Sequence, residues 1–296
     1  QLRTSYENQC ENWRVKELEP TTTKATFEEL TGRKDFQLRG DYGSAVINFG
    51  SRRDTIVTEA TLELSYTHSP ALLAVTSHVK VYLNNEVVSI LNIASDQSGK
   101  LQKQTIQLNP LSISGFNNLR FELIGHYSER CENPSHSSIW FDINNQSSLT
   151  LTRKPLKYKN DLVNFPEPFY DETDFKTLNL PFVFAHQPSK ESIHSAGILA
   201  SWFGSKSQWR GAEFPVVLNE LPQQHAIVFA TNSERPDFLA EHPIVEKPTL
   251  VMVSHPIYRS VKLLLVLGKD HEQLKQAVQG LVLGRELLTG QAVSID

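Results

Sequence analysis

The sequence lacks any apolar run that approaches the ~20 residues a membrane-spanning helix needs. Its longest run, residues 261–268, contains Lys262 and is followed at once by Lys269 and Asp270. A positively charged start followed by an apolar stretch is also missing, and the first residue is Gln1. We therefore expect a soluble chain from which any secretory signal is already absent.

The sequence also lacks a large excess of either positive or negative charge. The 29 Lys and Arg residues nearly balance the 33 Asp and Glu residues, which leaves a formal net charge of -4. The arginines are scattered rather than clustered. Because phosphate backbones are bound by concentrated positive charge, nucleic acid is not an expected partner. A chain of 296 residues is long enough for about two ordinary globular domains.

Only two cysteines are present, Cys10 and Cys131, and their separation matches no metal-binding or redox motif. In an oxidising compartment they could form a disulfide bond with each other. Two separate buried thiols are the alternative, and the residues alone do not decide between the two.

Motifs for cofactors and catalysis are missing too. No G-x-G-x-x-G, P-loop, G-x-S-x-G or H-E-x-x-H motif occurs. Ser254 and His255 are adjacent, so they cannot easily form a nucleophile–base pair. His126 and His136 flank one loop and could bind a metal ion, but loop histidines more often form ordinary hydrogen bonds. We predict no catalytic residue, no metal site and no cofactor.

Short segments of alternating polarity, separated by turn residues, fill residues 36–156. Such a series without an amphipathic helix predicts an all-β domain, a β-sandwich or jelly roll. Asn84 and Asn85 predict a tight hairpin, because Asn tolerates positive φ. We interpret residues 1–35, which are polar and aperiodic, as an N-terminal arm. The expected strands are Ala45–Phe49, Ile56–Tyr66, Val79–Leu83, Val87–Asn92, Gln104–Leu108, Leu119–Ile124, Ser138–Ile143 and Leu149–Leu151.

Two of these strands place an aromatic residue opposite their apolar side chains. Trp140 alternates with three apolar residues along 139–143, so it points outward. Tyr82 points outward from its strand by the same alternation. A large aromatic side chain among polar neighbours favours a flat partner, which a sugar ring or another protein provides.

The pattern changes after residue 156. Residues 157–179 contain two prolines and no regular period, which predicts an extended linker whose aromatic residues lie against a domain surface. Residues 180–296 alternate continuous apolar runs with helical patterns, which is typical of an α/β domain of the flavodoxin-like or Rossmann-like kind. The expected strands are Pro181–Ala185, Ala226–Ala230, Thr249–Val253, Lys262–Leu267 and Gln291–Ile295. The expected helices are Glu191–Phe203, Arg235–Leu239 and His271–Val282, with Ser189 and Asp270 as N-caps and with Gly204 and Gly284 after the last turns.

Two tryptophans, Trp202 and Trp209, lie around the predicted helix end at Gly204. In the simpler interpretation, Trp202 packs beneath the helix and Trp209 covers a domain edge. Alternatively, Trp209 and Arg210 contribute to a contact surface for another domain or subunit, because Trp and Arg are favoured at the centres of interfaces.

Longer motifs occur in order along the chain: Phe36–Gly40, Ser65–Leu73, Val79–Asn84, Gly125–Tyr127, Cys131–Pro134, Trp140, Ala200–Gly204, Trp209–Gly211 and Ala226–Asn232. Together they resemble the BcsB family, the periplasmic B subunit of bacterial cellulose synthase. The resemblance covers essentially all of the chain beyond residue 35.

The resemblance implies a jelly-roll carbohydrate-binding domain over residues 36–156 and a flavodoxin-like domain over residues 180–296. It also implies a second copy of each and a C-terminal membrane anchor, so we expect this chain to be the N-terminal half of a family member. Such a protein is non-catalytic, periplasmic and attached to the inner membrane. Its implied partners are the catalytic A subunit, nascent cellulose and other copies of itself.

The family is also labelled as binding cyclic di-GMP, but this sequence has neither the R-x-x-x-R nor the D-x-S-x-x-G motif of PilZ-type receptors. Our candidates for contact with the glucan are Trp140, Tyr82 and, from a loop, Tyr127. An assembly module without glycan affinity is the alternative hypothesis. A carbohydrate-active enzyme is the third.

Overall fold

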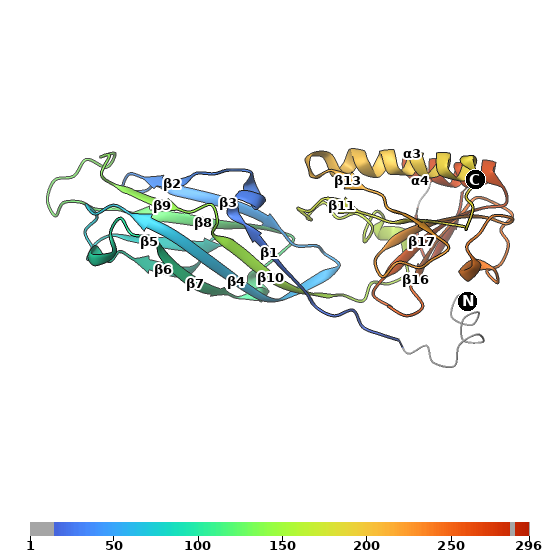
Figure 1. The fold of residues 1–296 in the computed structure, drawn as a ribbon, viewed down its shortest axis with the longest axis horizontal. Coiled ribbons are helices and arrows are strands. Elements are labelled where there is room, and N and C mark those ends of the chain that lie inside the picture. Colours follow the sequence, from blue (N-terminus) through green and yellow to red (C-terminus); the bar gives the residue numbers. More distant parts are fainter. Residues whose placement is uncertain (1–14, 285–287, 296) are drawn as a thin grey trace. The chain divides into compact units, whose positions relative to one another are not determined.

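The computed structural model describes residues 15–284 and 288–295. The chain forms two compact units. We call residues 20–154 with 173–175 the sandwich unit, and the remaining described residues the α/β unit (Figure 1).

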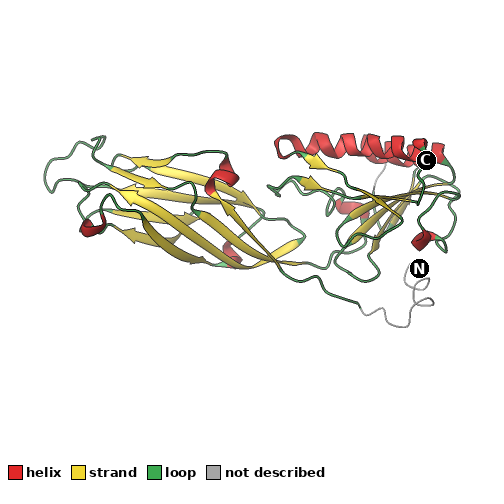
Figure 2. Ribbon diagram, in the orientation of Figure 1, coloured by secondary structure: helices red, strands yellow, loops and turns green. Residues whose placement is uncertain are grey.

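The sandwich unit consists of a six-stranded and a four-stranded sheet (Figure 2). The larger sheet has the order β1-β10-β4-β9-β2, with β7 also paired to β4, and the smaller has the order β3-β8-β5-β6. The strands are β1 (Thr21–Thr26), β2 (Phe36–Arg39), β3 (Ser44–Gly50), β4 (Thr55–His68), β5 (His78–Leu83), β6 (Glu86–Asn92), β7 (Gln102–Leu108), β8 (Phe116–Ile124), β9 (Trp140–Ile143) and β10 (Ser148–Pro155).

Alternation along these strands builds one core between the two sheets. Phe121 of β8 and Phe141 of β9 are both fully buried, and they belong to the same hydrophobic cluster although they come from different sheets. The predicted hairpin joins β5 to β6, with Asn84 at φ 49° and Asn85 at φ 71°. The predicted β-sandwich and its eight strands are therefore confirmed.

The interpretation of residues 1–35 as an arm is wrong from residue 20 onward. Strand β1 pairs with β10 along its whole length, and the short helix α2 (Phe27–Thr31) follows it. Thr26 and Glu29 form a capping box, and Phe27 is fully buried in the sandwich core. The alternation signal is missing because β1 is a threonine-rich edge strand with no buried residue.

The α/β unit is built on a six-stranded sheet of order β14-β12-β15-β17-β16-β18. Strands β14, β12, β15 and β17 are parallel, whereas β16 is antiparallel to both of its neighbours. Every residue of β15 and β17 is buried, as expected for strands covered on both faces. The strands are β12 (Phe182–Phe184), β14 (Val216–Leu218), β15 (Ala226–Thr231), β16 (Thr249–Ser254), β17 (Lys262–Gly268) and β18 (Ala292–Ser294), with a separate parallel pair, β11 (Leu178–Asn179) and β13 (Ala212–Glu213).

Two long helices, α3 (Lys190–Ser207) and α4 (His271–Leu283), pack on the same face of this sheet (Figure 2). The predicted N-caps Ser189 and Asp270 are confirmed, as is the left-handed Gly284 after α4. Gly204 was wrongly placed at a helix end. Helix α3 continues through it because Phe203 and Ser207 are both buried, and this packing outweighs the low helix propensity of glycine.

Two further segments differ from their predictions. The helix expected at 235–239 is a single 3-10 turn, Asp237–Leu239. Within the expected linker, the ring of Phe165 stacks on Trp202 at 5.5 Å, so the predicted packing of its aromatic residues against a domain is confirmed. The extended linker itself is wrong here, because Leu162 and Phe169 are buried in the α/β core. These residues lie inside the α/β unit because their apolar side chains complete its core.

Candidate functional site

The structure places the three aromatic candidates on different surfaces. Trp140 and Tyr82 point away from the core, as alternation predicts, and both are half-buried. Trp140 lies on the outer face of the six-stranded sheet and Tyr82 on the outer face of the four-stranded sheet. Because the two sheets pack through their inner faces, Trp140 and Tyr82 cannot contact one sugar chain side by side.

Trp140 belongs to a polar row at one edge of the six-stranded sheet. It lies opposite Arg39 of the edge strand β2. Two residues further along β9, Asp142 lies between Gln37 of β2 and Thr67 of β4. All five side chains are on the outer face, since the residues between them are buried. This row combines one large aromatic surface with several hydrogen-bonding groups.

Tyr82 is already engaged by its own sheet. The Arg120 guanidinium lies over its ring at 3.7 Å, and its hydroxyl donates to Glu122 Oε2 at 2.7 Å. Arg120 also donates to the same oxygen at 3.0 Å. The hydrogen bond from Tyr82 is the main reason that the pKa of Glu122 is lowered, with Arg120 acting in the same direction against partial burial. This network occupies one face of the Tyr82 ring and its hydroxyl group.

Tyr127 lies in a loop that is ordered around one carboxylate. Glu132 accepts hydrogen bonds from His126 Nδ1 at 2.8 Å and from the backbone amides of Tyr127 and Ser128 at 2.7 Å each. These bonds, His126 first, hold the pKa of Glu132 below its ordinary value. The Tyr127 ring stacks on His136 at 4.7 Å, so both candidate histidines serve the loop itself. Among the described residues no cluster has the composition of a metal site.

The predicted interface residues lie just after helix α3, in the 3-10 turn Gln208–Arg210. Trp209 is 72% exposed, and Arg210 lies over the Tyr170 ring at 4.8 Å and donates to the Asp171 carbonyl at 2.9 Å. Trp202 is partly buried against the α/β core, as the simpler interpretation predicted. An interface role for Trp209 and Arg210 remains a prediction.

The cysteine prediction falls partly outside the described residues. Cys10 is not described, whereas Cys131 is exposed in the loop before β9. The alternative of two buried thiols is therefore wrong for Cys131. A disulfide bond to Cys10 remains a prediction.

The carboxyl ends of β12, β15 and β17 form the edge at which parallel α/β sheets commonly bind ligands. Here Glu234 accepts a hydrogen bond from the Ser189 amide at 3.1 Å, and His271 Nε2 lies 3.0 Å from its other oxygen. Burial raises the pKa of Glu234, but hydrogen bonds from Ser192, His271 and Ser189 outweigh burial and lower it. The N-terminus of α3 thus holds a carboxylate of its own chain.

Ser189, His271 and Glu234 resemble a catalytic triad only in composition. Ser189 Oγ lies 2.9 Å from His271 Nε2, the same nitrogen that faces Glu234. A nucleophile–base–acid relay uses opposite ring nitrogens for the two contacts. The cluster therefore caps a helix and lacks the arrangement that activates a nucleophile.

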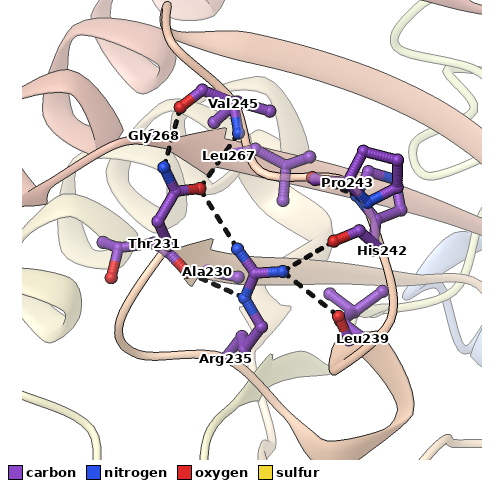
Figure 3. A pocket seen from close by; sticks show the side chains of 10 residues that line it. Ala230, Thr231, Arg235, Leu239, His242, Pro243, Val245, Leu267 and Gly268 are labelled. Carbon is purple, nitrogen blue, oxygen red and sulfur yellow. Dashed lines mark hydrogen bonds between the residues drawn. The ribbon is translucent and has the colours of Figure 1, made fainter.

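A small pocket lies beside this edge, at the ends of β15 and β17 (Figure 3). The Arg235 guanidinium donates there to the carbonyl of His242 at 2.8 Å, to that of Leu239 at 3.3 Å and to Asn232 Oδ1 at 3.1 Å. The remaining volume is about 10 Å³, which holds one water molecule at most. Burial lowers the pKa of Arg235. Sequence reasoning missed both Glu234 and Arg235, because each acts through contacts that only the fold creates.

Family models match both parts of the chain. Residues 20–155 match "Cellulose synthase BcsB, first CBM domain" and residues 161–295 match "Cellulose synthase BcsB, first FD domain". The chain belongs to the BcsB family. The resemblance inferred from its motifs is thereby confirmed.

Curated BcsB relatives align with nearly all of this chain. A cyclic di-GMP-binding protein of Escherichia coli (strain K12) is 47% identical over 274 residues, which are 92% of this chain and 35% of the relative. A relative with the same description from Xanthomonas axonopodis pv. citri is 40% identical, and the alignment covers 93% of this chain and 35% of the relative. Another, from Komagataeibacter xylinus, is 31% identical, and the alignment covers 89% of this chain and 32% of the relative. The chain thus spans about a third of these relatives.

Likeness to solved structures is much weaker. The alignment with dimeric latent PorU from Porphyromonas gingivalis covers 73% of this chain and 30% of the PorU chain, at a TM-score of 0.31 and 10% identity.

In the part of the chain that the structure describes, no helix is both long and apolar enough to cross a membrane.

Proposed function

We propose that this chain is the periplasmic, non-catalytic part of a cellulose synthase subunit that guides the extruded β-1,4-glucan and supports the catalytic A subunit. One observation carries the proposal: the two units match the first CBM and first FD domains of BcsB in that order. The fuller layout is a jelly roll joined to a flavodoxin-like domain and tied to the inner membrane through an anchor elsewhere in the protein. The jelly roll supplies weak contacts of the kind a moving polymer requires.

Three features support a role in surface contact rather than catalysis. Trp140 is presented outward on a regular sheet, as a sugar ring requires. The Ser189–Glu234–His271 cluster lacks the geometry of a relay. Arg235 fills the adjoining pocket with bonds to its own loop. We expect no resident cofactor.

Binding of cello-oligosaccharide by the full 296-residue chain tests this proposal. We expect weak binding that falls severalfold in Trp140→Ala, because the loss of one stacked ring removes on the order of 1 kcal/mol. Unchanged binding in this variant removes Trp140 from the contact. Release of reducing ends from cellulose by the purified chain contradicts a non-catalytic role.

A second candidate function, assembly without glycan affinity, is favoured by exposed apolar side chains. Trp209 is 72% exposed, and Val46, Val87 and Ile90 are 42–52% exposed on the outer face of the four-stranded sheet. Such surfaces suit other copies of the subunit or other periplasmic proteins. Sedimentation across a concentration series, with and without oligosaccharide, separates the two functions.

A further inference from the structure

The row on the outer face of the six-stranded sheet differs from the other aromatic sites in having unused groups. Tyr82 is covered by Arg120, and Tyr127 is stacked on His136. The Trp140 indole has no ring or cation contact with any other described residue. It is therefore the aromatic candidate whose ring is left for a partner.

Asp142 carries the second observation. Its carboxylate accepts no hydrogen bond from the residues that the structure describes, and its Oδ1 is shielded from water without a donor. A shielded carboxylate oxygen without a donor is costly in a folded protein. The terminal torsion of an aspartate is broad, so either oxygen can turn outward to meet a hydroxyl group. The side chain is half-buried, which leaves one side open to a ligand.

The register fixes how these groups are spaced. Trp140 and Asp142 are two residues apart on β9, which is roughly 7 Å along a strand. Thr67 and Gln37 lie directly opposite Asp142 on the two neighbouring strands, roughly 5 Å to either side. Gln37 Oε1 accepts from Arg39 Nε at 2.5 Å, an arrangement that leaves the Gln37 amide N–H groups for other acceptors.

We propose that Trp140 and Asp142 together form the glucan subsite of the sandwich unit, with Thr67 and Gln37 beside them. The Trp140 ring stacks on the apolar face of one sugar. The Asp142 carboxylate accepts hydrogen bonds from the hydroxyl groups of the next sugar. Thr67 and Gln37 form further hydrogen bonds with that sugar. The ligand is neutral, because one carboxylate and one exposed arginine, Arg39, give the row no net charge, and its identity as a β-linked glucan is taken from the proposed function. This inference rests on the proposed function and assigns it to one face of the sandwich.

The test is calorimetric or NMR titration of the full chain with cellohexaose, with α-linked maltohexaose as the comparison probe. We expect Asp142→Asn to weaken cellohexaose binding by about tenfold, because a charged acceptor is lost. Trp140→Ala is expected to weaken it at least severalfold, and Trp140→Tyr to retain part of it. Asp96→Asn removes the same charge from an exposed turn that is outside this row, and it should bind as the parent chain does.

Thr67→Val is a second variant for the case in which Asp142→Asn unfolds, and thermal unfolding of each variant identifies that case. A loss of binding in Thr67→Val without a loss of stability supports the subsite. If the parent chain binds cellohexaose and both Asp142→Asn and Trp140→Ala bind equally well, the assignment to this face is overturned while the proposed function stands. If the parent chain does not bind at all, both are overturned.

Discussion

Glu234 and Ser189 are joined across the carboxyl edge of the parallel sheet, where the Glu234 carboxylate accepts the Ser189 backbone amide at 3.1 Å. The amides and the dipole at a helix N-terminus attract anions. Here the attracted anion is a side chain of the same unit. A phosphate group of a nucleotide would have to displace Glu234 to accept the Ser189 amide.

We predict that Glu234→Ala lowers stability by about 1–3 kcal/mol, because the Ser189 amide and His271 lose their acceptor. The same variant should gain stability from added phosphate, which can enter the vacated position. Denaturant unfolding with and without phosphate measures both effects. Glu220→Ala, at an exposed glutamate, is the control. Equal phosphate responses in the parent chain and Glu234→Ala would contradict the prediction.

Lys262 is 2% exposed, and its ammonium group donates to Asn160 Oδ1 and Ser254 Oγ at 2.8 Å each. Burial lowers the pKa of Lys262 from 10.5 to about 8. The unfolded chain therefore binds more protons than the folded chain between these pH values, so stability should rise with pH across this window. The gain is about 3 kcal/mol at most.

Lys262→Met tests this sign. The variant loses the buried charge, and Ser254 Oγ still donates to Asn160 Oδ1 at 3.0 Å. We expect Lys262→Met to be as stable as the parent chain at pH 7 or more stable, and to lack the rise between pH 8 and 10.5. Urea unfolding at several pH values measures the free energy of unfolding of both proteins. Their difference excludes the titration of the surface lysines, because both proteins share these residues. A parallel rise in both proteins would exclude Lys262 as its source.

His255 is expected to affect stability at acidic pH. It is 3% exposed, and its Nδ1 accepts the backbone amides of Ile257 and Tyr258 at 3.1 Å each. Burial lowers its pKa from 6.5 to about 4. Because the unfolded chain takes up the proton first as pH falls, stability should decrease by up to about 3 kcal/mol between pH 6.5 and 4.

His255→Leu should be less stable than the parent chain at every pH, because two amides lose their acceptor. Between pH 6.5 and 4, however, its stability should fall by less than that of the parent chain, because the titrating imidazole is gone. The exposed His186→Ala is the matched control and should follow the parent chain. Hydrogen exchange of residues 255–258, measured at pH 7 and pH 4.5, locates the effect. Unchanged exchange of this loop at pH 4.5 would place acid sensitivity elsewhere.

Much of the fold followed from local pattern. Strands with one buried side, such as β8 and β9, gave clear alternation and were predicted, and so were Ser189 and Asp270 as caps. Strands β1 and β14 were missed because they are edge strands without a buried side chain. Edge position is a property of the assembled sheet and leaves little trace in a short sequence.

The candidate site was predictable only in part. Alternation correctly turned Trp140 outward, but it could not reveal that Arg120 covers Tyr82, since this contact depends on the register between β5 and β8. The closure of the sheet edge by Glu234 likewise joins residues 45 positions apart. Such contacts follow from topology, which sequence patterns do not specify.

The last prediction concerns Gly50, which ends strand β3 and lies against residues 173–175 within the sandwich unit. A Cβ at Gly50 would overlap the carbonyl oxygen of Thr173, a fully buried residue whose hydroxyl donates to the Ser51 carbonyl at 2.9 Å. The backbone cannot move aside as the end of a flexible side chain can, so Gly50→Ala should destabilise the sandwich unit by about 2–4 kcal/mol.

Gly197→Ala is the matched control for Gly50→Ala. Its Cβ would meet no atom on the exposed side of α3, and we expect it to stabilise the α/β unit by about 1 kcal/mol. Hydrogen exchange followed separately in each unit distinguishes the two effects, and a Gly50→Ala chain with unchanged protection in β3 and β8 would show that residues 173–175 do not pack there.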